Sequence, residues 1–128
     1  YVDDSKSTNP GSVVAALQAF EAPIVLIAGG KSKRTDFRAM GAAIEKRTKA
    51  VVLIGEAADE MSEAIGAATP VARANSMDEA VAFARGLAVP GDVVLLSPGC
   101  ASFDMFASAE ARGDAFAAAA SALAGARG

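Results

Sequence analysis

The residues best suited to chemistry in this chain lie at 96–104, in the sequence Leu-Ser-Pro-Gly-Cys-Ala-Ser-Phe-Asp. They directly follow the apolar run at 93–96, which is typical of a strand buried on both faces of a parallel sheet. The small residues predict a turn, and Ser102 stands where a helix beginning near Phe103 would take its N-cap. Backbone N–H groups and a hydroxyl would then face the carboxyl edge of the sheet, where an anion binds favourably.

A second candidate is the glycine turn with cations after the apolar run at 24–27. The sequence Gly-Lys-Ser that begins at Gly30 is similar to the end of a phosphate-binding P-loop. That motif needs a further glycine five residues earlier, where this chain has Val25, so the P-loop is excluded. Lys31, Lys33 and Arg34 then form either a solvated loop or a loop from which one lysine reaches an acidic ligand.

A third candidate is the polar run at 3–9, Asp-Asp-Ser-Lys-Ser-Thr-Asn, directly before an expected helix. Thr8 or Asn9 would cap that helix, and the acidic residues would complement its dipole. Capping needs only one such residue, so the surplus of polar side chains favours a binding site slightly over simple capping.

The residue types that are absent or single restrict the chemistry. The chain has no histidine, so it can build neither an imidazole base nor a triad that contains one. Its one cysteine, Cys100, excludes an internal disulfide, suits a reducing cytosol and is most simply a buried small residue. No pair of residues has metal-ligand spacing, so we expect no metal site in this chain. We interpret Asp104, Glu110 and Asp114 as surface or capping groups.

Length and composition restrict the class of protein. The 128 residues, 52% of them apolar, predict one domain with a real core. No apolar stretch approaches the roughly 18 residues of a membrane span, and we find no signal peptide. The net charge of −3 without a basic stripe argues against nucleic acid. We therefore expect a cytoplasmic protein, and the start at Tyr1 suggests a fragment of a longer one.

The elements that position these segments alternate between strand and helix. Strands are predicted at 24–27, 51–54 and 93–96, with weaker ones at 70–72 and 1–2. Helices are predicted at 10–20, 36–47, 57–65, 76–87 and 111–124, with Ser76 capping the fourth. Their expected buried stripes are Phe37, Met40 and Ile44; Met77, Ala80, Val81 and Ala84; and Phe116, Ala120 and Leu123. The alternation predicts an α/β fold with a mainly parallel sheet.

Taken in order, these segments resemble the Mur ligase family, and most of all its D-glutamate-adding branch. The matching sequences are Asp-Ser-Lys-Ser-Thr-Asn at 4–9, Gly-Gly-x-x-Lys-x-x-Asp-Phe at 29–37, and residues 96–104 with Glu-x-Arg-Gly at 110–113. The resemblance covers essentially the whole chain. It implies a three-layer Rossmann-like domain, residues 1–128, which is the C-terminal, amino-acid-binding domain of a three-domain enzyme.

The resemblance also implies a reaction. An ATP-dependent ligase of peptidoglycan precursor synthesis, which supports cell-wall growth, cell shape and division, would add D-glutamate to UDP-N-acetylmuramoyl-L-alanine through an acyl phosphate. Asp4 would face the ribose of ATP, and Lys6 its phosphate region. ATP and Mg²⁺ would be held mainly by the missing central domain, over which this domain closes. The fragment alone would contain no catalytic residue and would be inactive.

By the same resemblance, Thr8, Lys33 and Ser102 would bind the carboxylates of D-glutamate, assisted by the backbone N–H of Phe103. Lys33 fits the family spacing, whereas Lys31 does not. A doubly anionic ligand would thus meet one lysine, two hydroxyl groups and a helix N-terminus.

One position departs from the family pattern, and two other functions stay open. The family usually has an aromatic residue against the D-glutamate side chain where this chain has Ala109. The alternatives are a sister ligase of the Mur or folylpolyglutamate type that adds another amino acid, and a non-enzymatic Rossmann-like module that binds an anion. A P-loop upstream of Tyr1 would favour a ligase.

Overall fold

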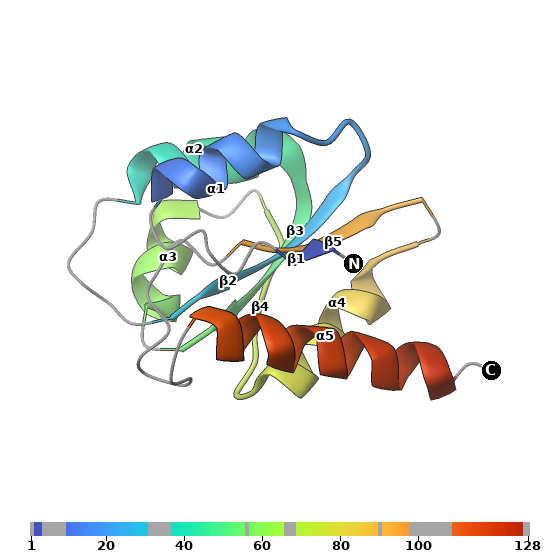
Figure 1. Cartoon of the computed structure of the whole chain (residues 1–128). Coiled ribbons are helices and arrows are strands. Elements are labelled where there is room, and N and C mark those ends of the chain that lie inside the picture. The colour runs from blue at the N-terminus through green and yellow to red at the C-terminus, as the bar shows by residue number, and fades with distance from the viewer. Residues whose placement is uncertain are drawn as a thin grey trace.

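A computed structural model describes residues 2–3, 10–30, 37–55, 57–65, 69–89, 91–97 and 109–126. In this part of the chain, five strands and five helices alternate along the sequence (Figure 1). The strands are β1 Val2–Asp3, β2 Ile24–Gly29, β3 Thr48–Ile54, β4 Val71–Arg73 and β5 Val93–Leu96. The helices are α1 Pro10–Gln18, α2 Arg38–Arg47, α3 Ala58–Ile65, α4 Met77–Leu87 and α5 Ala109–Ala126.

The strands form one parallel sheet in the order β1-β5-β2-β3-β4. Helices α1, α2 and α3 cover one face, and α4 and α5 cover the other (Figure 1). Side chains alternate along each strand, so Leu26 packs under α1–α3 whereas Val25 and Ile27 pack against α4 and α5. Burial of both faces explains why β2 and β5 contain no polar residue. The α/β class with a parallel sheet is confirmed.

The predicted elements are all present, with shifted ends. The strand predicted at 93–96 has those bounds, and α5 begins two residues earlier than predicted, at Ala109. The largest shift is in β3, which begins at Thr48 rather than at residue 51. Thr48 ends α2 and starts β3, and its hydroxyl donates to the carbonyl of Ile44 at 2.7 Å. Residues 48 and 49 concealed this part of the strand because their side chains are polar and do not continue the apolar run that begins at Ala50.

The predicted helix faces are confirmed wherever the structure describes them. Met77, Ala80, Val81 and Ala84 are buried in α4, and the hydroxyl of Ser76 accepts the N–H of Glu79 at 3.1 Å, as an N-cap does. Phe37, Met40 and Ile44 are also buried, although Phe37 stands just before α2. Phe116 and Ala120 of α5 are buried, and the side chain of Leu123 lies outside the described residues.

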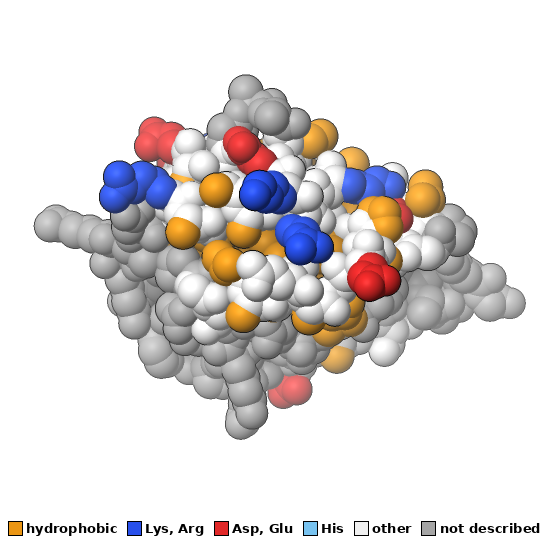
Figure 2. Space-filling model, turned by 90° about the horizontal axis from the view of Figure 1, so that it is seen from above, with side chains coloured by type: hydrophobic (Ala, Val, Ile, Leu, Met, Phe, Trp, Pro, Cys, Tyr) orange, Lys and Arg blue, Asp and Glu red, His pale blue; other side chains and the backbone are white. Residues whose placement is uncertain are grey.

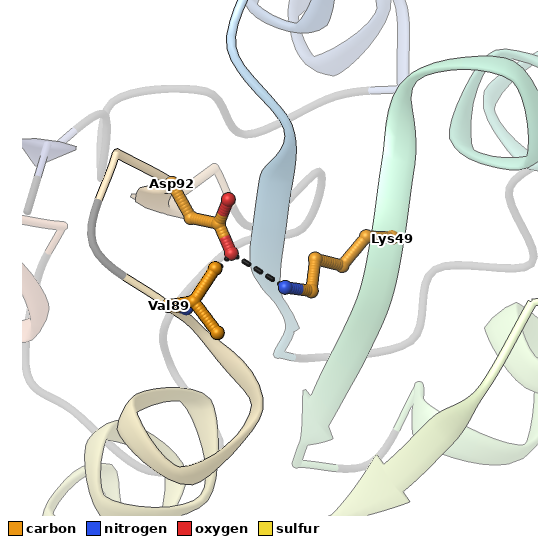
Figure 3. A network of polar contacts seen from close by, with 3 residues as sticks. All are labelled: Lys49, Val89 and Asp92. Carbon is orange, nitrogen blue, oxygen red and sulfur yellow. Dashed lines mark hydrogen bonds and ion pairs between the residues drawn. The ribbon is translucent and has the colours of Figure 1, made fainter.

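A polar network ties the amino edge of the sheet together (Figure 3). In the pairing between β2 and β3, Ile24 pairs with Thr48 and Val25 pairs with Ala50, so Lys49 has no partner in β2. The Lys49 ammonium donates to the Asp92 carboxylate at 2.6 Å, and the same oxygen accepts the N–H of Val89 at 2.9 Å. Both hydrogen bonds lower the pKa of Asp92 below its ordinary value, and the one from Lys49 has the larger effect.

The surface over α1 and α2 carries charges of both signs. Figure 2 shows Lys and Arg side chains among Asp, Glu and small apolar groups on the described part of this face, without one continuous basic field. None of the helices in the described part of the chain is both long and apolar enough to cross a membrane.

Candidate functional site

The three polar segments singled out in the sequence follow three neighbouring strands. Residues 4–9 follow β1, residues 98–108 follow Ser97 at the end of β5, and residues 31–36 follow Gly30 after β2. In the sheet, β5 lies between β1 and β2, and Leu96 of β5 pairs with both Asp3 and Ile27. Strands pack about 4.8 Å apart, so the ends of β1 and β2 are about 10 Å apart. The fold therefore brings the starts of all three segments to one edge.

This edge is also where the helix connections change sides. The helices that follow β1 and β2 pack on one face, and α5, the helix that follows β5, packs on the other. Adjacent strands whose following helices leave to opposite faces open a crevice at their carboxyl ends. Because β5 lies between β1 and β2, the strand on each side of it is followed by a helix on the face opposite to α5. The three segments thus start at the place where open α/β sheets bind their ligands.

The described residues at this edge are buried and hydrogen-bonded. Ser97 is fully buried, and its N–H donates to the carbonyl of Ile27 at 3.1 Å, which continues the β2–β5 ladder by one residue. On the other side of β2, Gly29 pairs with Ile54, and the carbonyl of Gly30 accepts the N–H of Ala57 at 2.9 Å. The base of the crevice is therefore built from backbone groups whose positions the sheet determines.

The groups predicted to bind ligands lie outside the described residues. These are the side chains of Asp4, Lys6, Thr8, Lys33 and Ser102 and the backbone N–H of Phe103. Cys100 and Asp104, for which we predicted structural roles, also lie outside the described residues. The structure describes the strand before each of these segments, and the roles of the residues stay predictions. Ala109, which has the position of the family's aromatic residue, is the first residue of α5. It therefore starts the helix that leads away from the 98–108 segment.

Arg112 is a feature that the sequence analysis left without a role. It is fully buried, four residues into α5, and it is the largest of the fully buried side chains described. A guanidinium is seldom buried without a specific purpose, because removing it from water costs several kcal/mol. The sequence did contain an indication, since Arg112 is the one cation within the alanine-rich segment at 109–126.

A hollow of about 400 Å³ opens at the carboxyl ends of β3 and β4. The Arg73 guanidinium donates to the Asp59 carboxylate on its wall, and both side chains are more than half exposed. An exposed ion pair of this kind contributes at most about 1 kcal/mol. The lining residues are Leu53, Gly55, Ala58, Asp59, Arg73, Ala74 and Asn75.

No metal site is seen at this edge of the sheet in the described part of the chain. No group of three or more His, Cys, Asp or Glu residues there could hold a metal ion. Asp92, whose pKa is lowered, lies next to β5 at its amino end, on the opposite edge of the sheet. Its network therefore contributes to the fold and takes no part in the candidate site.

Comparison with known families agrees with this arrangement. Residues 1–100 match the family model described as "Mur ligase, glutamate ligase domain". The chain belongs to the Mur ligase family. The match extends over β1 to β5 and so includes all three strands that form the crevice.

Two curated relatives of this Mur ligase domain carry the same name. A UDP-N-acetylmuramoylalanine--D-glutamate ligase of Syntrophus aciditrophicus is 49% identical over 116 residues, which is 91% of this chain and 26% of that protein. A ligase of the same name from Pseudomonas fluorescens is 48% identical over 120 residues, 91% of this chain and 27% of that protein. The Mur ligase domain thus spans about a quarter of the length of these relatives.

A solved structure supports the fold of the Mur ligase domain. It is a crystal structure of a domain from Haemophilus ducreyi, described as part of a UDP-N-acetylmuramate:L-alanyl-gamma-D-glutamyl-medo-diaminopimelate ligase. The two domains superpose with a TM-score of 0.60 over 91% of this chain and 88% of the other, at 16% identity. At this identity the likeness shows a shared fold.

Proposed function

We propose that this domain is the C-terminal domain of an ATP-dependent ligase that adds D-glutamate to UDP-N-acetylmuramoyl-L-alanine in peptidoglycan synthesis, and that it binds the D-glutamate. The observation that carries the proposal is the order β1-β5-β2, because the three segments distant in sequence start from the ends of these neighbouring strands, the edge at which open α/β sheets bind ligands. Curated relatives that match 91% of the chain are named as ligases of D-glutamate, which supports the choice of amino acid.

The proposed ligand chemistry follows from the charge of D-glutamate. Its two carboxylates would be bound by the Lys33 ammonium, the hydroxyls of Thr8 and Ser102, and the backbone N–H of Phe103. A charge-assisted hydrogen bond contributes about 1.5–3 kcal/mol, so Lys33 would supply the largest single share of the binding free energy. The small residues that follow β5 in the sequence would leave room for a carboxylate close to backbone N–H groups.

The proposed reaction forms an amide bond in two transfers. The γ-phosphoryl group of ATP passes to the carboxylate of UDP-N-acetylmuramoyl-L-alanine, and ADP leaves. The amine of D-glutamate then attacks the acyl phosphate, loses a proton and displaces inorganic phosphate. In this domain, Asp4 would contact the ribose of ATP and Lys6 its phosphates. Mg²⁺ and most contacts to ATP would come from the central domain, so the isolated domain would be inactive.

The proposal is tested by removing one of two neighbouring cations in the full-length ligase. Lys33→Ala should raise the KM for D-glutamate about 10- to 100-fold, which corresponds to the loss of about 1.5–3 kcal/mol. Lys31→Ala removes the same charge two residues away and should leave that KM within about twofold. Steady-state phosphate release at saturating ATP measures both.

Three outcomes would contradict the proposal. An equal KM for the two variants would remove Lys33 from the site, and preference for an amino acid other than D-glutamate would assign the domain to a sister ligase. A parent protein that forms no amide with any amino acid would favour the anion-binding module.

A further inference from the structure

Gly29, the last residue of β2, and Gly30, which follows it, both have positive φ. Gly29 has a φ of 119° and Gly30 a φ of 149°, values that residues with a Cβ rarely adopt. A Cβ added to Gly29 would lie 1.9 Å from the carbonyl oxygen of Ile54, the residue with which Gly29 pairs in β3. Only glycine allows the end of β2 to run this close to the end of β3.

The backbone of Gly30 is joined to the start of α3. Its carbonyl accepts the N–H of Ala57 at 2.9 Å, and both residues are buried. Ala57 stands directly before α3, whose first-turn N–H groups have no partner within the helix. The chain that leaves β2 is therefore held against the first turn of α3, past the end of β3.

The same segment returns to the core at a second buried point. Phe37 is 4% exposed and packs in the core with Met40 and Ile44, and its carbonyl accepts the N–H of Gly41 at 2.8 Å. The six residues between Gly30 and Phe37 are thus flanked on both sides by a buried residue whose carbonyl accepts a backbone hydrogen bond.

We propose that the hydrogen bond between Ala57 and Gly30 is a positioning device for the amino-acid substrate. This inference rests on the proposed function, in which Lys33 binds a carboxylate of D-glutamate. Lys33 follows Gly30 by three residues, and three residues of chain span at most about 11 Å, so the location of Gly30 limits where the Cα atom of Lys33 can lie. A displacement of about 1 Å in a binding group is enough to weaken its contact substantially. Gly29 and Ala57 act through the backbone and do not touch the substrate.

The test removes one backbone donor without changing a side chain. Gly29→Ala is unsuitable, because its Cβ would displace the ends of β2 and β3 themselves. In the full-length ligase, lactate incorporated at position 57 replaces the Ala57 amide by an ester and deletes the N–H. The matched control is the same replacement at Ala74, whose N–H donates to the carbonyl of Leu53, also at 2.9 Å. That bond lies at the same sheet edge and leads into α4.

The ester at position 57 should raise the KM for D-glutamate at least tenfold and leave kcat and the KM for ATP within about twofold. The ester at position 74 should lower stability to urea by a similar amount without raising the KM for D-glutamate. Equal KM values for the two esters would overturn the inference.

Lys33→Ala, measured in parallel, separates this inference from the proposed function. If Lys33→Ala raises the KM and the ester at position 57 does not, the positioning role fails and the proposed site survives. If Lys33→Ala leaves the KM unchanged, the proposed site fails and the positioning role fails with it.

Discussion

The close contact between α2 and α3 predicts that replacing a helical glycine by alanine destabilises this protein, whereas such a replacement usually stabilises a helix. Replacing a glycine within a helix by alanine ordinarily stabilises the protein by about 1 kcal/mol. Gly41 lies in α2, and a Cβ there would be 2.1 Å from the carbonyl oxygen of Ala64 in the backbone of α3. Ordinary contact begins at 3.4 Å, so α3 would have to move away by about 1.3 Å. That movement would separate side chains of α2 and α3 in the core, such as Met40 and Met61.

The magnitude follows from two opposing terms. Overpacking of a core costs about 1–3 kcal/mol, and backbone cannot rotate away as a side chain can, so we take the upper end of this range. After the helix-propensity gain of about 1 kcal/mol, Gly41→Ala should lower the free energy of unfolding by about 2 kcal/mol. The matched control is Gly86→Ala in α4, where an added Cβ meets nothing within 4 Å. That variant should gain about 0.5–1 kcal/mol.

Urea unfolding followed by far-UV circular dichroism measures both free energies. The two variants should differ by about 3 kcal/mol, with the parent between them. Equal stabilisation by both substitutions would refute the close approach of α2 and α3 at Gly41. A lower free energy of unfolding for Gly86→Ala than for the parent would instead refute the expected gain in helix propensity, on which the comparison depends.

Two further predictions concern the polar contacts of the described chain. The pKa of Asp92 is lower in the folded than in the unfolded state, where it is about 3.9, so the ionised carboxylate stabilises the fold. This stabilisation is complete above the unfolded pKa and is lost as the pH falls through the folded pKa. The difference in unfolding free energy between the parent and Asp92→Asn should therefore shrink from pH 6 to pH 2 in urea titrations; a difference independent of pH would contradict the contact with Lys49. Ser76→Ala should cost about 1 kcal/mol by deleting the N-cap of α4, whereas Ser62→Ala within α3 should cost nothing measurable by the same method.

The sequence alone determined the identity of the elements, because apolar runs and helical periodicity are local properties. The run at 93–96 predicted β5 with its observed bounds, and Ser76 predicted the cap of α4, because each depends on a few consecutive residues. Element ends were less certain where polar residues join a strand. Thr48 and Lys49 belong to β3 because the neighbouring strand pairs with that region, a cause that lies outside their own sequence.

The polar segments of the candidate site could also be found in the sequence, since they follow strands and combine hydroxyls, glycines and cations. That they start at one edge was decided only by the tertiary structure, which inserts β5 between β1 and β2. Strand order depends on which faces the connecting helices cover, and that is settled by packing between residues far apart in the chain. The approach of Gly29 to Ile54 and the burial of Arg112 have the same origin.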